Sequence, residues 1–119
     1  MSDFVSQMQT VENAIKGTAK GLFAKIDQMT FRMTIDGLKS NDYEALCITI
    51  DQLVKEKKPV SIPPLYVVSE AHPNVRAREK AKEAIKSLDP KGEVERLVAG
   101  KSIKEATNAL IERFGNFKS

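Results

Sequence analysis

The sequence has little of what builds disulfide scaffolds, zinc sites or membrane spans. Its 119 residues include one cysteine, Cys47, and one histidine, His72, so neither an intramolecular disulfide nor a cysteine–histidine zinc cluster can form. No window approaches the roughly 18 apolar residues of a membrane span. The first ten residues also lack the basic start and apolar run of a secretory signal. We therefore expect no membrane span and a reducing, cytoplasmic compartment.

An excess of one charge sign is also missing. The 19 basic and 16 acidic residues are interspersed along the chain and leave a formal net charge of +3. This balance is too even to indicate nucleic-acid binding on its own. Because 41% of the residues are hydrophobic, the chain can build one modest core. The length then predicts a single domain over residues 1–119.

The motifs that mark common enzyme sites are absent from the sequence. There is no phosphate-binding loop, dinucleotide fingerprint, nucleophile elbow or metal-ligand cluster. Catalysis needs several convergent groups, and neither His72 nor Cys47 stands in such a motif. We interpret His72 as a corner residue and Cys47 as a small core residue. The prediction is a non-enzyme with no catalytic residue, no cofactor and no metal.

What the sequence does contain is helical periodicity, beginning in the N-terminal segment 2–28. Apolar residues recur there in steps of three and four or their sums, which is typical of an amphipathic helix. They are Phe4, Met8, Val11, Ile15, Leu22, Ile26 and Met29. Gly17 and Gly21 interrupt the pattern, and each lowers the stability of a helix by about 1 kcal/mol relative to alanine. We therefore predict one helix or two; the glycines either weaken the helix locally or let a neighbouring helix approach closely.

A first helical hairpin is predicted over residues 29–58. The polar run from Lys39 to Asp42 ends a short helix at Leu38 and supplies an N-cap for a longer one that starts at Tyr43. Pro59 ends the second helix, because proline cannot continue one.

A second hairpin is predicted over residues 60–88. Pro63 and Pro64 fit the first turn of a helix, where the missing N–H would be unpaired anyway. The β-branched run over residues 60–68 could also form a strand, but two adjacent prolines would remove hydrogen-bond donors from its ladder, so we favour a helix. His72-Pro73-Asn74 is the corner before a longer helix that ends at Leu88.

Two helices are predicted in the C-terminal segment 90–115. The first is short and is stopped by Gly100. Ser102, followed three residues later by Glu105, matches the capping-box pattern and marks the start of the second.

The middle of the chain matches itself at an offset of 32 residues. This alignment places Met33 on Leu65 and Ile35 on Val67, and the turn of the first hairpin falls on the turn of the second. Each copy is a short helix, a polar corner and a longer helix, within the period range of helical repeat architectures.

The second copy, Ile62 to Leu88, resembles a HEAT-like repeat, and its form is similar to the short HEAT-like repeats of phycobilisome lyase-type proteins. The residues that carry the resemblance are Ala77-Arg78, Ala81, Ala84-Ile85 and Leu88 in the second helix, and His72-Pro73-Asn74-Val75 at the corner. The match is weak over residues 29–57, where Leu46 stands in place of the arginine, and it does not reach the two ends. The resemblance implies an all-α fold, a short α-solenoid of HEAT-like hairpins with capping helices at both ends.

HEAT-like repeats imply a helical surface that binds proteins. We therefore predict a non-catalytic interaction module, an adaptor or scaffold, for an acidic or mixed-charge protein; the resemblance extends this to phycobilisome or photosynthetic assembly. The second helices of the two hairpins, lying side by side, would present the contact residues. These are Asp42, Tyr43, Glu44, His72, Asn74, Arg76, Arg78 and Lys82.

Other functions stay open at this point. A nucleic-acid-binding helical protein would use Arg76, Arg78 and Lys82 and would bind with a steep salt dependence. Glu79 and Glu83 are expected to neutralise part of that basic group from three and four residues away. A small enzyme or chromophore lyase-like protein would use His72 or Cys47. The long apolar stripe at the N-terminus also makes a homodimer an option.

Overall fold

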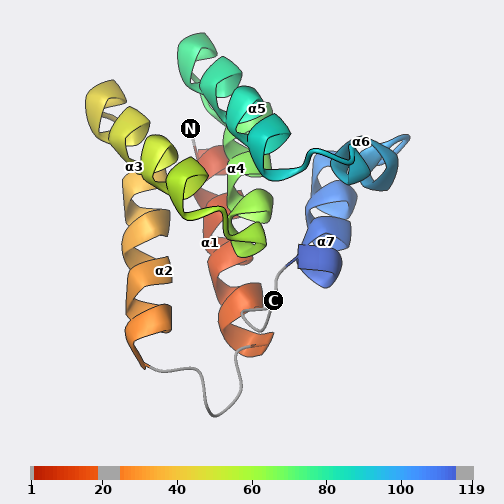
Figure 1. The fold of residues 1–119 in the computed structure, drawn as a ribbon, viewed down its shortest axis with the longest axis horizontal. Helices are drawn as coiled ribbons and strands as arrows, with labels where there is room; N and C mark the ends of the chain where they lie inside the picture. The colour runs from red at the N-terminus through yellow and green to blue at the C-terminus, as the bar shows by residue number, and fades with distance from the viewer. Residues whose placement is uncertain (1, 19–24, 115–119) are drawn as a thin grey trace.

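The computed structural model describes residues 2–18 and 25–114, and every regular element in these ranges is helical (Figure 1). The all-α prediction is therefore confirmed. The elements are α1 (Ser2–Thr18), α2 (Lys25–Leu38), α3 (Tyr43–Glu56), the 3-10 turn η1 (Pro59–Ser61), α4 (Ile62–Ala71), α5 (Val75–Leu88), α6 (Glu93–Val98) and α7 (Ile103–Phe114).

The predicted N-terminal segment contains parts of two helices. α1 ends at Thr18, and α2 already begins at Lys25, four residues before the first hairpin was expected to begin at residue 29. No glycine or proline stands between Lys25 and Asp36, so nothing in the sequence stops a helix there. Gly21, where a break was considered, lies outside the described residues.

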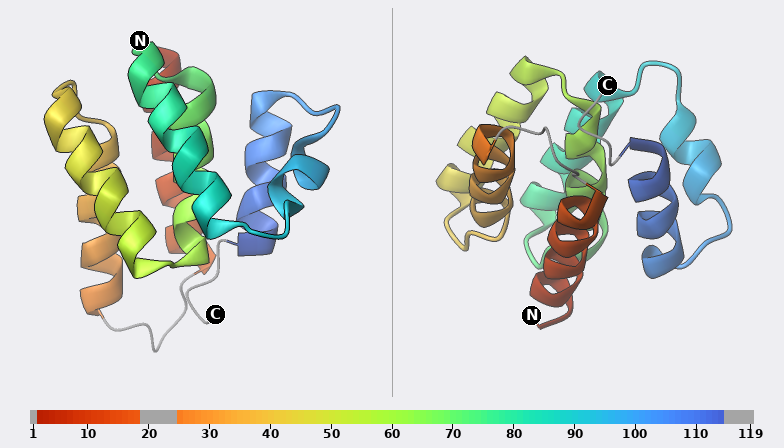
Figure 2. Two further views of the ribbon diagram at one scale, coloured as in Figure 1. Left: turned by 45° about the horizontal axis from the view of Figure 1, so that its top comes forward. Right: turned by 90° about the horizontal axis from the view of Figure 1, so that it is seen from below.

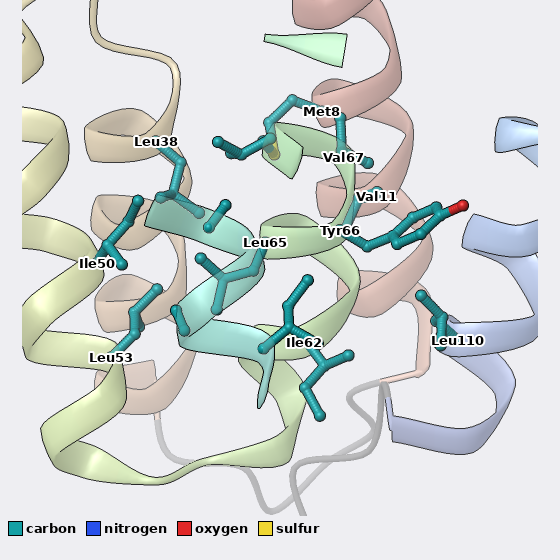
Figure 3. Close-up of a cluster of buried hydrophobic side chains, with 14 of the residues drawn as sticks. Met8, Val11, Leu38, Ile50, Leu53, Ile62, Leu65, Tyr66, Val67 and Leu110 are labelled. Carbon is teal, nitrogen blue, oxygen red and sulfur yellow. The ribbon is translucent and has the colours of Figure 1, made fainter. Parts of the chain in front are cut away.

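The centre of the fold is α4. Its residues from Ile62 to Ser69 are all buried, as expected for a helix that is apolar on every side (Figure 3). Pro63 and Pro64 occupy its first turn, as predicted, and the alternative strand over residues 60–68 is wrong. Ser61 precedes the helix but its side chain makes no capping hydrogen bond; η1 leads into the helix instead.

Two helical hairpins, α2–α3 and α4–α5, pack against each other. α3 lies beside α5, and α2 contacts α4 (Figure 2). α1 packs against α4, α2 and α7, and α7 packs against α4 and α6. The apolar side chains that meet around α4 therefore come from elements along the whole described chain, from Met8 to Leu110 (Figure 3).

The C-terminal helices begin and end where the sequence predicts. Gly100, after α6, has the left-handed φ of 72° that glycine adopts without strain. At the start of α7, the Glu105 backbone N–H donates to Ser102 Oγ over 3.2 Å, and the Ser102 N–H donates to Glu105 Oε1 over 3.2 Å. The predicted capping box is therefore confirmed.

The pairs aligned at the 32-residue offset share their burial in part. Ile35 and Val67 are both fully buried, whereas Met33 is 71% exposed and Leu65 is fully buried. The difference arises because α4 is covered by α1, α2, α5 and α7, while α2 has fewer neighbours. No helix in the described part of the chain is long and apolar enough to cross a membrane.

Candidate functional site

The N-termini of α3 and α5 are capped in the same way. Asp42 Oδ1 accepts a hydrogen bond from the Glu44 N–H over 3.0 Å, and Asn74 Oδ1 accepts one from the Arg76 N–H over 2.8 Å. These bonds satisfy backbone donors that the first turn of a helix leaves unpaired. Both cap residues and Glu44 are exposed, so they also contribute polar groups to the surface at this end of the two helices.

Tyr43 and Arg76 join the two helices. The Arg76 guanidinium carbon lies 5.0 Å from the centre of the half-buried Tyr43 ring, the geometry of a cation–π contact. A hydrogen bond with the Cys47 side chain, together with burial, raises the pKa of Tyr43, against the opposing charges of Arg76 and Lys80. The phenol therefore stays neutral at physiological pH. Two of the predicted contact residues, Tyr43 and Arg76, therefore touch each other.

One helical turn further along α5, an ion pair makes a second link between α3 and α5. Lys80 Nζ lies 2.9 Å from Asp51 Oδ1, and this contact raises the pKa of Lys80. Glu79 and Glu83, which were expected to neutralise part of the basic group, form no ion pair with a base of α5 among the described residues. The partner comes from the neighbouring helix instead.

His72 lies inside the corner between α4 and α5. Its ring stands edge-on to Phe4 of α1 at 4.9 Å, and the residue is only 7% exposed. Nδ1 accepts from the Asn74 N–H over 3.0 Å, which assigns the proton of the neutral ring to Nε2. Burial and then the charge of Arg78 lower the pKa of His72, although the backbone of Ser40 and Asn74 acts in the opposite direction.

Arg78 and Lys82 leave the predicted contact set for the same geometric reason. Each lies two residues after Arg76 or Lys80, hence about 200° around the helix from them. The Arg78 side chain is half-buried, and its Nη1 donates to the His72 carbonyl over 2.6 Å. Lys82 is exposed, but it lines a groove on another side of α5.

Two exposed aliphatic side chains were missed by the sequence reasoning. Ile48 is 70% exposed on α3, and Val75 is 57% exposed at the start of α5. A helical wheel holds the signal for Ile48, because position 48 falls opposite the buried Leu46 and Ile50. We define the α3–α5 face as the exposed or half-buried residues that the two helices present together. They are Asp42, Tyr43, Glu44, Ile48, Asp51, Asn74, Arg76 and Lys80. Val75 stands seven residues before Lys82, hence on the same side of α5 as Lys82, and is not part of the face.

A second feature is a groove with a volume of about 610 Å³ between α4, α5 and α6, which we call the α4–α6 groove. Its size lies within the range of about 300–1,000 Å³ that is typical of small-ligand sites. Buried Tyr66 of α4 lies in its wall, and Lys82 and Lys86 are its bases. Its acidic residues are Glu70, Glu79, Glu83, Asp89 and Glu95.

No protein-family model, curated protein or solved structure matches this chain. Among the described residues, no group of three or more histidine, cysteine, aspartate or glutamate side chains is placed to hold a metal ion. The functional interpretation therefore depends on the two surfaces described above.

Proposed function

We propose that the protein is a non-catalytic adaptor that binds another protein through the α3–α5 face. The observation that supports it most is the exposure of Ile48 on α3, a helix that the Tyr43–Arg76 contact and the Lys80–Asp51 ion pair hold beside α5. Aromatic residues and arginine are enriched in the centres of protein interfaces, and apolar side chains with a polar rim are typical of such sites. A rigid pair of helices also presents these groups with little loss of conformational entropy on binding.

The charges of the face suggest a mixed-charge partner rather than an acidic one. Arg78 and Lys82 do not belong to the face, so its bases are Arg76 and Lys80. Three carboxylates, from Asp42, Glu44 and Asp51, lie on the same helices. Since Lys80 is already paired with Asp51, Arg76 is the base that we expect to meet a partner carboxylate.

The repeat interpretation is part of the same proposal. The packing of α3 beside α5 and of α2 against α4 supports two stacked HEAT-like units, with α1 and the α6–α7 pair as caps of a single domain. The resemblance of Ile62–Leu88 extends the proposal to phycobilisome or photosynthetic assembly, and the low cysteine content to a cytoplasmic location. Self-association through the same face is an outcome that the experiment below detects.

The alternative functions have less support from the geometry. A nucleic-acid site would need Arg76, Arg78 and Lys82 on one surface, but Arg78 is engaged in the corner and Lys82 lines an acidic groove. A catalytic role for His72 would need an accessible ring, whereas its ring is buried and Nδ1 already accepts a hydrogen bond.

The experiment compares a variant of the face with a variant of equal chemistry elsewhere. Ile48→Lys changes a residue that is 70% exposed on the face, and Met33→Lys changes one that is 71% exposed on α2. Partners are captured from a native extract with each form and with the wild type, and the affinity for each identified partner is then measured. We expect a partner that binds the wild type and Met33→Lys equally, and Ile48→Lys at least about tenfold more weakly.

Two results would overturn the proposal. One is recovery of nucleic acid in place of protein. The other is a partner that is retained by Ile48→Lys and by Arg76→Glu. If the captured protein is a second copy of the chain, sedimentation of the purified wild type will show a dimer that Ile48→Lys dissociates.

A further inference from the structure

The α4–α6 groove has the opposite charge to the chain as a whole. Five carboxylates against two lysines give its lining a formal charge of −3, whereas the chain carries +3. Asp89 is used internally, because its Oδ1 and Oδ2 accept from the N–H groups of Glu93 and Val94 over 3.0 and 2.8 Å. The other four acidic side chains, Glu70, Glu79, Glu83 and Glu95, form no ion pair or side-chain hydrogen bond with the described residues. Their charge is therefore available to a ligand.

Tyr66 adds a hydrogen-bonding group to the wall of the groove. Its side chain is 8% exposed, and in Figure 3 its hydroxyl points away from the aliphatic side chains around Leu65. Ser69 donates to the Tyr66 carbonyl, but the Tyr66 hydroxyl has no hydrogen-bond partner in the described part of the chain. The ring is buried, whereas the hydroxyl is not among the fully buried polar atoms of the described residues and is accessible from the groove. Burial and Glu70 raise the pKa of Tyr66, so the hydroxyl keeps its proton and can both donate and accept.

The walls of the groove also have an apolar part. Ile85 of α5 and Val94 and Val98 of α6 line it together with the carboxylates. Lysine and arginine side chains match such a surface, because their methylene stems pack on apolar groups while their charged ends reach polar ones. Arginine in particular places several donors against carboxylates at once.

We propose that the α4–α6 groove binds a basic segment of a partner protein, with lysine or arginine side chains directed to Glu70, Glu83 and Glu95 and a hydrogen bond to the Tyr66 hydroxyl. This site lies apart from the α3–α5 face and goes beyond the adaptor function proposed above. A protein that uses both surfaces would hold two segments at once, and each surface can be inactivated by substitutions that leave the other unchanged.

The test uses a short fluorescent peptide that alternates arginine with leucine, and a second peptide with glutamate in place of arginine. Binding to the full chain is measured by fluorescence anisotropy at about 0.05 M and about 0.5 M salt, since screening is much stronger at the higher concentration. We expect the arginine peptide to bind, the glutamate peptide not to bind, and the affinity to fall with salt.

Two groove variants and a matched control locate the site. The double variant Glu70→Gln/Glu95→Gln should weaken binding of the arginine peptide about tenfold or more, which corresponds to about 1.4 kcal/mol or more. Tyr66→Phe, which removes only the hydroxyl, should weaken it about threefold. The control Glu56→Gln/Glu112→Gln removes the same charge from exposed positions outside both the groove and the α3–α5 face and should leave the affinity unchanged. Circular dichroism checks that each variant is folded.

Several outcomes would overturn the proposal. Equal binding of both peptides, or an equal loss in the control variant, would mean non-specific attraction. Amide chemical-shift changes confined to the α3–α5 face would place the peptide on the wrong surface. Binding of spermidine that depends on the groove, without binding of the arginine peptide, would mean a small-cation site instead. Failure of the α3–α5 face experiment has no bearing on these results, because Ile48 and Arg76 are not groove residues.

Discussion

At the scale of the residue, the corner between α4 and α5 depends on a neutral His72. Its Nδ1 accepts from the Asn74 N–H, its backbone carbonyl accepts from Arg78, and its ring packs on Phe4, so one residue connects α1, α4 and α5. Protonation would remove the acceptor at Nδ1 and place a second positive charge beside Arg78. The fold therefore binds this proton less well than the unfolded chain does.

This difference predicts a pH dependence of stability. The pKa of His72 is lowered by folding from the ordinary value of 6.5, so the unfolded chain takes up the proton first as the pH falls. Stability should be full above about pH 6.5 and should decline below it, towards the lowered pKa. Thermal unfolding followed by circular dichroism between about pH 7.5 and pH 5 should show this decline, and His72→Gln should flatten it. An equal decline in His72→Gln would exclude His72 as its source.

The Tyr43–Arg76 contact permits a second prediction at this scale. A cation–π pair on a partly exposed surface contributes about 0.5–1 kcal/mol. In a double-mutant cycle with Tyr43→Ala and Arg76→Ala, urea unfolding should therefore give a coupling energy of this size. The cycle is needed because Tyr43→Ala also removes packing and the hydrogen bond to Cys47. A coupling energy of zero would mean that the two side chains only happen to lie close together.

At the scale of the element, α2 and α3 cross where a side chain is missing. A Cβ added to Gly37 would overlap with the Thr49 hydroxyl and lie 3.0 Å from Thr49 Cγ2. Thr49 cannot easily turn aside, because its hydroxyl donates to the Ala45 carbonyl over 3.0 Å. The glycine thus permits the close approach of two helices, although glycine lowers the helix propensity of α2.

Gly37→Ala should therefore destabilise the protein, although alanine has a higher helix propensity than glycine. Alanine favours a helix over glycine by about 1 kcal/mol, whereas overpacking costs about 1–3 kcal/mol. We expect a net loss of up to about 2 kcal/mol in the free energy of unfolding, measured in urea. In the background of Thr49→Ala, which removes the two nearest atoms and leaves only Cβ at 3.2 Å, the same substitution should be neutral or stabilising. Stabilisation by Gly37→Ala alone would show that the helices can separate without cost.

At the scale of the whole molecule, the sequence predicts helices better than it predicts what surrounds them. Pro63, the His72-Pro73-Asn74 corner and the Ser102–Glu105 box are local signals, and the elements they predict are present in the structure. The candidate site was predicted in part. Tyr43 and Arg76 meet because α3 lies beside α5, but whether Arg78 faces the surface or the corner depends on packing that no local pattern contains.

The α4–α6 groove could not be predicted from the sequence for the same reason. Its carboxylates come from three helices and the turn between α5 and α6, and they have no common spacing. The hydrophobic pattern of the segment assigns Tyr66 to the core, and its exposed fraction of 8% agrees with that assignment. Only the tertiary structure shows that Tyr66 lies in the wall of the α4–α6 groove.

A final prediction compares Met33 and Leu65, which the 32-residue offset aligns. Because the two hairpins are buried to different degrees, truncating these two side chains should change stability by different amounts. Leu65 is fully buried in the central helix, so Leu65→Ala should cost about 2–5 kcal/mol through lost contacts and the cavity left behind. Met33, at 71% exposure, buries little, so Met33→Ala should change stability by no more than about 0.5 kcal/mol. Urea unfolding of both variants measures the difference. If Met33→Ala were also costly, a further chain or a second copy must cover α2 in solution. In that case sedimentation should show an assembly that Met33→Ala weakens, and the isolated chain would not be the functional unit.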